Sequence, residues 1–182
     1  MQIKFAGAAL ALAFAAPGLA QTPPPPPPPE ARTSAMPYVM AAGMSDQYEI
    51  QSSRIAVKKS PNARTRRYAA MLIQHHNKTT AATTRAAMRA RLAPPAPMLD
   101  PRAAPSLAEL NAASPADFDR VYFGQQVPAH QAALDLHSSY AANGDAAPLR
   151  ATARTAVPVV RKHLTDAQRM MNGMPGHNMS RM

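Results

Sequence analysis

The sequence contains no cysteine, few aromatic residues and half as many acidic as basic residues. Because there are no thiols, the chain can form no disulfide, its stability must come from its core, and a metal site must do without thiolate ligands. Runs of β-branched or aromatic residues are scarce, and no Asn-Gly turn separates two alternating segments, so we expect no β-sheet. Beyond residue 20, no stretch is apolar enough to span a bilayer.

The N-terminal segment has the pattern of a secretory signal. Lys4 precedes an apolar run, and small residues lead up to Ala20, as they do before a signal-peptidase cleavage site. We therefore expect residues 1–20 to be a signal peptide that exports the protein across the inner membrane of a bacterium. The mature protein should then lie in the periplasm or in association with the outer membrane.

The remaining chain divides by composition into three parts. Residues 21–35 contain seven consecutive prolines and predict a Pro-rich linker, a stiff polyproline II spacer. Residues 36–171 suit one domain with one core. Residues 172–182 contain two glycines and a proline and predict a flexible Met-rich tail.

Four long helices are predicted in the domain by start signals and by apolar residues at helical spacing. They run from Met36 to Lys59 with a break near Gly43, from Ser60-Pro61 to Leu92, from Ser114-Pro115 to Asn143, and from Asp145 to Met171. Short turns join the first two and the last two, whereas about twenty proline-rich residues separate the pairs, more than a hairpin needs. The predicted fold class is therefore all-α, a ferritin-like four-helix bundle with a long crossover between helices 2 and 3.

One polar residue of each predicted helix lies near mid-bundle. At 1.5 Å per residue, the first three share a level to within about 6 Å, and His163 lies roughly 7 Å from it. Three imidazoles and one carboxylate suit a single divalent transition metal ion such as zinc, copper or iron. The candidate metal ligands are Glu49, His76, His130 and His163.

A di-iron centre of the bundle type is disfavoured. It needs a glutamate three residues before the histidines of two helices, together with further glutamates. Those positions hold Ile73, Val127 and Val160. No second catalytic group is recognisable either, so we do not expect an enzyme.

The same histidines also fit a structural interpretation. Each could be hydrogen-bonded to Glu49, to Tyr122 or to a carbonyl freed by a proline kink, as a buried network that fixes helix register. His75 points about 100° away from its neighbour and is either an outer partner or a surface residue. His137 is expected to be structural. The methionines and the histidine of the tail suit Cu(I), although Met-rich chain ends are also common.

The basic residues gather on the first helical hairpin. Cleavage after Ala20 would remove Lys4 and leave 19 basic and 10 acidic residues, a net charge of +9. Such a surface could meet an anionic envelope surface, or simply be solvated; the export signal argues against nucleic acid. The residues concerned are Arg54, Lys58, Lys59, Arg64, Arg66, Arg67, Lys78, Arg85, Arg89 and Arg91.

Several motifs carry a family resemblance: Asp46 to Ala56, Met71-x-x-x-x-His76, Phe118-Asp119-x-x-Tyr122, Gln126-Val127-x-x-His130 and Val157-Pro158-x-x-x-x-His163-Leu164. Their order and spacing are similar to the domain of unknown function 4142 family of exported bacterial proteins, regarded as ferritin-like. The resemblance implies the bundle and the export route, but little about activity. By matching motif positions it carries over Glu49, His76, His130 and His163.

Two departures from the family accompany this resemblance. His75 stands where the family usually has aspartate, and Pro128 is unusual there.

Two functions stay open. The first is an exported bundle that binds one transition metal ion in storage, sensing or stress. The second is a non-catalytic envelope module with a structural polar core and a basic surface for anionic partners.

Overall fold

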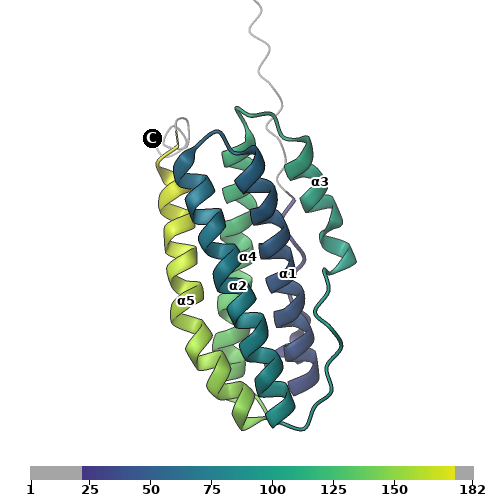
Figure 1. Cartoon of the computed structure of the whole chain (residues 1–182). Coiled ribbons are helices and arrows are strands. Elements are labelled where there is room, and N and C mark those ends of the chain that lie inside the picture. The colour runs from purple at the N-terminus through teal and green to yellow at the C-terminus, as the bar shows by residue number, and fades with distance from the viewer. Residues whose placement is uncertain (1–21, 175–182) are drawn as a thin grey trace, which may run out of the picture.

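The computed structural model describes residues 22–174, and this part of the chain is all-helical (Figure 1). The elements are η1 (Pro29–Arg32), α1 (Ala35–Lys59), α2 (Ala63–Arg89), η2 (Pro101–Ala103), α3 (Ala104–Ala112), α4 (Phe118–Asn143) and α5 (Ala147–Asn172). Helix α1 packs on α2 and α4 on α5, and the two hairpins meet through α1–α4 and α2–α5 contacts. This is the predicted four-helix bundle.

The connection between α2 and α4, residues 90–117, runs back along the bundle and carries η2 and α3 (Figure 1). As a result α2 and α4 begin at the same end, as the predicted crossover requires. Gln125 fastens α3 to the bundle, because its Nε2 donates to the Ser106 carbonyl at 3.1 Å and to Glu109 Oε2 at 2.8 Å. Gln125 Oε1 in turn accepts from the Tyr48 hydroxyl at 2.7 Å.

The helix starts differ from the predicted ones by a few residues. Ser60 does not cap α2; the N-cap is Asn62, whose side chain accepts from the Arg64 amide at 2.9 Å. Ser114 likewise accepts from the Asp117 amide at 3.2 Å, and α4 begins only at Phe118. Each Ser-Pro pair therefore forms a turn just before a helix, since a serine hydroxyl stabilises such turns as readily as helix caps.

Two glycines have roles other than those predicted. Helix α1 continues without a break through Gly43, where a Cβ would lie 3.2 Å from Pro97 of the crossover. Gly144 has φ −63° and ψ 146° rather than the left-handed conformation, and a Cβ there would collide with the Tyr140 ring. Both glycines are needed for close approach.

The last predicted cap is also wrong. The N-cap of α5 is Ala146, which makes no side-chain bond. Asp145 instead accepts a hydrogen bond from the Tyr140 hydroxyl at 2.9 Å. The carboxylate is therefore used to hold the end of α4.

The proline segment lies against the bundle where the sequence predicts a spacer. Pro24 to Pro28 line a pocket together with α1 and α4 residues that include Ala41, Tyr48 and Ala129. Small side chains on the two helices leave room for the proline rings. The division into residues 1–20, 21–35, 36–171 and 172–182 stays a prediction, and 1–21 and 175–182 lie outside the described residues.

Two apolar clusters fill the two ends of the bundle. One contains Tyr38, Leu136, Tyr140 and Leu149; the other contains Leu72, Phe118, Tyr122 and Phe123. The predicted polar residues lie between these clusters along every long helix. Within residues 22–174, no helix has the length and apolarity needed to cross a membrane.

Candidate metal centre

Each of the four long helices places one of the predicted ligands in the interior. Glu49 lies on α1, His76 on α2, His130 on α4 and His163 on α5. Their exposed fractions are 1%, 3%, 1% and 1%. The offset of His163 along the bundle that residue counting predicts is not found, because all three imidazoles lie at one level.

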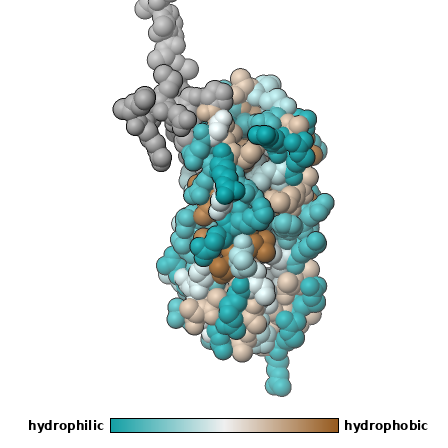
Figure 2. Space-filling model, turned by 90° about the vertical axis from the view of Figure 1, so that its left-hand side faces the viewer, coloured by the Kyte–Doolittle hydropathy of each residue, from teal (hydrophilic) through white to brown (hydrophobic). Residues whose placement is uncertain are grey.

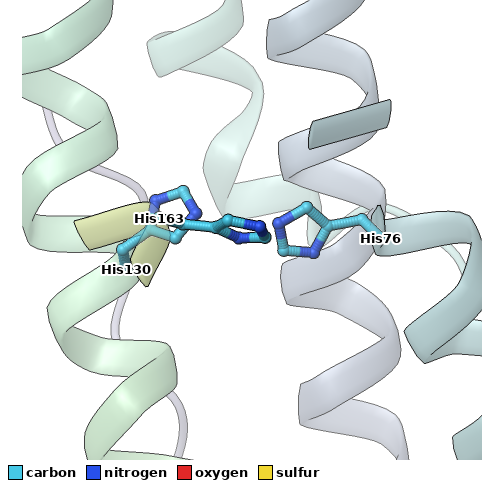
Figure 3. Close-up of side chains that lie close together, drawn as sticks. All are labelled: His76, His130 and His163. Atoms are coloured by element: carbon cyan, nitrogen blue, oxygen red, sulfur yellow. The ribbon is translucent and has the colours of Figure 1, made fainter. Parts of the chain in front are cut away.

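The three histidines form a compact triangle, which we call the histidine cage (His76, His130 and His163). Figure 3 shows His76 pointing across the interior toward the other two rings. Each ring offers one ligand atom, and these atoms lie within 4.8 Å of one another. The ring centroids are 5.4–5.7 Å apart. A transition metal ion with bonds of about 2.0–2.1 Å to each nitrogen needs a slightly tighter triangle, within reach of small rotamer changes.

Each cage ring has one nitrogen held by the protein and one left over. His76 Nδ1 donates to Asp46 Oδ1 at 2.7 Å, and His130 Nδ1 donates to the Gln126 carbonyl at 2.9 Å. His163 Nε2 lies 2.8 Å from His75 Nδ1. The remaining nitrogens, His76 Nε2, His130 Nε2 and His163 Nδ1, are buried and have no hydrogen-bond partner among the described residues.

This pattern fixes the neutral tautomers of His76 and His130 that metal binding requires, whereas in the His163–His75 bond either ring can donate. A carboxylate and a carbonyl only accept, so His76 and His130 carry their proton on Nδ1 and present a lone pair on Nε2. In the corresponding tautomer of His163, Nε2 donates to His75 and Nδ1 presents its lone pair. Metal-binding histidines almost always donate their other ring N–H to such an outer acceptor.

Asp46 is the residue that sequence reasoning missed. Besides His76, its carboxylate accepts from the hydroxyls of Thr79 at 2.9 Å and Thr80 at 2.7 Å. It is 5% exposed. It lies three residues before Glu49, and therefore on the same face of α1; that spacing was the available signal.

Glu49 lies beside the cage rather than in it. Its Oε1 is 3.7 Å from His130 Nδ1, and the group whose ligand atoms lie within 4.8 Å consists of the three histidines. Burial raises the pKa of Glu49 to about 7, although the nearby His76 and Gln126 act in the opposite direction. That the Glu49 carboxylate is a metal ligand stays a prediction.

The cage imidazoles differ in their protonation. Burial, together with the neighbouring histidines, lowers the pKa of His130 to about 3 and that of His163 to about 2. Burial also acts to lower the pKa of His76, but its hydrogen bond to Asp46 and the charges of Asp46 and Glu49 outweigh this and raise it. Two of the three rings are thus held in the neutral form that binds metal.

The structural interpretation explains some of the hydrogen bonds of the buried histidines, but not the unpartnered nitrogens of the cage. Tyr122 bonds to Ser53 rather than to a histidine, and His130 uses the Gln126 carbonyl rather than that of Gly124, which faces Pro128. His137 is bonded to the Tyr38 hydroxyl at 2.9 Å, which fits its predicted structural role. A purely structural network would not leave one buried nitrogen on every cage ring without a partner.

The methionines at the end of α5 and at the start of the tail lie away from the cage. Within the described residues, Met170, Met171 and Met174 pack against the apolar cluster around Phe118. The predicted Cu(I) ligands further on, including His177, lie outside the described residues.

Solved structures with the same fold include three of CopM with a bound metal. The chain aligns with CopM in the Cu(II)-bound form at a TM-score of 0.65 and 17% identity, over 76% of this chain and 96% of that one. CopM in the Ag-bound form gives 0.64 and 17%, over 79% and 98%. A DUF305 fragment from Deinococcus radiodurans gives 0.67 and 15%, over 82% and 100%. At these identities the similarity shows the fold alone.

Sequence comparison is more specific. Among curated proteins no match is found. The family model described as domain of unknown function (DUF4142) matches residues 20–170, which include all four predicted ligands and Asp46. The chain therefore belongs to the DUF4142 family.

Proposed function

We propose that this protein binds one divalent transition metal ion in the histidine cage and serves metal handling or stress protection in the bacterial envelope. One observation carries the proposal. Three buried histidines from three different helices each offer a ligand atom within 4.8 Å of the others, and each ring keeps one buried nitrogen without a partner while the chain itself holds the other.

The ligands would be His76 Nε2, His130 Nε2 and His163 Nδ1. Asp46 and Glu49, both buried beside the cage, would supply negative charge to offset that of the ion, since a buried cation needs compensation. Glu49 or solvent would take the fourth position. Three imidazoles with an open position are typical of zinc and copper sites, and iron is also compatible.

Copper is the metal to test first. Imidazole sites bind Cu(II) more tightly than other divalent first-row ions, and structures with this fold include CopM in Cu(II)-bound, Cu(I)-bound and Ag-bound forms. The signal-like pattern of residues 1–20 supports a location outside the cytoplasm.

Metal analysis of the untagged protein tests the proposal. After incubation with Cu²⁺, Zn²⁺ or Fe²⁺ and desalting, we expect about one bound ion per chain for the preferred metal, and its loss in His76→Ala, His130→Ala and His163→Ala. His137→Gln is the matched control, because it alters another buried histidine of α4 and should keep the ion. Wild-type protein that retains no metal, or a His137 variant that loses it equally, would overturn the proposal.

A second candidate, an envelope module that contacts anionic surfaces, is favoured by the exposed cations of the first hairpin. Arg54, Lys58, Arg64, Arg67 and Lys78 are exposed, and the face seen from the α5 side in Figure 2 is mainly hydrophilic around a small hydrophobic patch. However, Lys59 is used inside the fold, where its Nζ donates to the carbonyls of residues 110, 111 and 113. Salt-sensitive binding to vesicles with anionic lipid, lost when Arg64 and Arg67 are replaced by Gln, would support this role.

A further inference from the structure

The histidine cage is closed in the structure, which raises the question of how an ion reaches it. The three rings and Glu49 are at most 3% exposed. An ion can therefore enter only where a side chain at the edge of the cage is itself accessible from solvent. Each cage ring has one hydrogen-bond partner on its outer side, and these three partners mark the three edges of the cage: Asp46, the Gln126 carbonyl and His75.

Two of these edges are sealed. Asp46, behind His76, is buried and covered by the hydroxyls of Thr79 and Thr80, both of which donate to it. Behind His130 stands a backbone carbonyl of α4, that of Gln126, which is fully buried. Neither group can exchange places with solvent without local unfolding of its helix.

The third edge is different, because the outer partner of His163 is a metal-binding side chain at the surface. His75 is partly exposed, and its Nδ1 lies 2.8 Å from His163 Nε2. The two rings are stacked, with centroids 5.1 Å apart and planes 19° from parallel. His163 therefore connects the partly exposed ring of His75 with the other two rings of the cage.

We infer that His75 is the entrance ligand of the cage: it takes a hydrated transition metal ion from solvent and passes it to His163. This rests on the proposed metal site. The ion binds His75 Nδ1 when the hydrogen bond to His163 opens, and water leaves the ion. Rotation of His163 then brings its own Nδ1 to the ion and carries it inward. One metal–nitrogen bond replaces another, with no change of oxidation state and no net proton transfer.

The charges around His75 suit a weak, transient site better than a storage site. Lys78 and Lys162 lie near the ring; Lys162 is paired with Asp166 at 2.6 Å, so Lys78 is the cation that most disfavours a resident metal ion. Lys78 also slows the approach of a cation, by an amount that salt reduces. Replacing Lys78 by Gln should therefore raise the loading rate about two-fold at low salt, whereas Lys58→Gln, on the exposed end of α1, should not.

A purely positioning role for His75 makes a different prediction. If His75 only held the tautomer of His163, its loss would weaken binding at equilibrium and leave the association rate unchanged. His75→Gln separates the two roles, because the glutamine amide oxygen can still accept from His163 Nε2 but is a poor ligand for copper or zinc.

Stopped-flow mixing with Cu²⁺ gives the test. The chain has five tyrosines and no tryptophan, so quenching of tyrosine emission follows loading, with His76→Ala as the background for surface binding. For His75→Gln we expect a loading rate at least about ten-fold lower, with the stoichiometry kept and the equilibrium affinity within about three-fold of wild type.

The outcomes are distinguishable. An unchanged loading rate in His75→Gln, or a weaker affinity with an unchanged association rate, overturns the entrance role and leaves the metal site intact. Wild-type protein that shows no saturable quenching beyond the His76→Ala background overturns both the entrance and the proposed function.

Discussion

The bundle holds buried histidines in two regions that are built on opposite principles. At one end, which we call the tyrosine end (Tyr38, His137 and Tyr140), the Tyr38 and Tyr140 rings stack at 3.9 Å and the Tyr38 hydroxyl bonds to His137 Nδ1 at 2.9 Å. At mid-bundle, in the histidine cage, the His130 ring packs edge to face against both other imidazoles. Both regions are buried, but they differ in how many fully buried polar atoms lack a hydrogen-bond partner.

Hydrogen-bond partners distinguish the two regions. Seven buried side-chain polar atoms lack a partner in residues 22–174; five belong to Glu49 and the cage, and none to the tyrosine end. An unsatisfied buried polar atom costs about 1–3 kcal/mol. A fold that leaves a fully buried, unpartnered nitrogen on every cage ring and none at the tyrosine end indicates that the cage is arranged for a ligand from outside the chain, whereas the tyrosine end is arranged for stability.

Lowering the pH should give the largest effect, a loss of unfolding free energy. Histidines of both regions should contribute to this loss. Burial lowers the pKa of His130, His137 and His163 to about 3, 4 and 2, from 6.5 in the unfolded chain. Below pH 6.5 the unfolded state therefore binds protons that the native state does not, and stability falls as the pH drops toward 4. Glu49, with a pKa raised from 4.5 to about 7, acts in the opposite direction between these values.

The three histidines together take up more protons on unfolding than Glu49 releases. We therefore expect metal-free protein to lose on the order of 1–3 kcal/mol of unfolding free energy per pH unit between pH 6 and 4.5. Urea unfolding followed by circular dichroism measures this. His137→Gln removes one of the protons taken up on unfolding, so it should reduce the slope of unfolding free energy against pH by about 1.4 kcal/mol per pH unit. Stability that stays flat from pH 7 to 5 would show that the histidines are not buried in neutral form.

Asp46→Asn should give an intermediate effect confined to the cage. The amide is nearly isosteric, but it carries no charge and no longer obliges His76 to keep its proton on Nδ1. Loss of such an outer partner typically lowers metal affinity about 10–100-fold. Competition titration against a chelator measures the change. An affinity equal to wild type would mean that Asp46 serves only the fold, and Asp135→Asn, on the exposed face of α4, is the matched control.

Tyr38→Phe should give the smallest effect, confined to the tyrosine end. It removes the hydroxyl that bonds to His137 and keeps the stacked ring, so we expect a loss of about 1 kcal/mol of unfolding free energy. Metal content should stay unchanged. If this variant lost bound metal, the two regions would be coupled, and the division between a stabilising end and a binding centre would fail.

The fold was predictable because its determinants are local. Helical periodicity and the lengths of three connections are enough to give the bundle and its crossover, and the counting of turns brought one residue per helix to the same level. The helix caps were less predictable, since Ser60, Ser114 and Asp145 can hydrogen-bond in a turn or at a helix start with similar energy.

The outer contacts of the cage could not be predicted from spacing alone. Helical spacing places Asp46 one turn before Glu49, but whether its carboxylate reaches His76 depends on how α1 and α2 are rotated against each other. The same holds for His75, whose direction from α2 suggested either surface or outer partner; only the position of α5 decides that it meets His163. Relative rotation of packed helices is set by side-chain interdigitation across the whole interface.

The placement of the cage on three helices has a mechanical consequence. His76 comes from the first hairpin, and His130 and His163 come from the second. An ion bound by all three would fasten the two halves of a chain that has no cysteine to link them. Metal supply would then govern how readily those halves part, much as the redox state governs a domain closed by a disulfide.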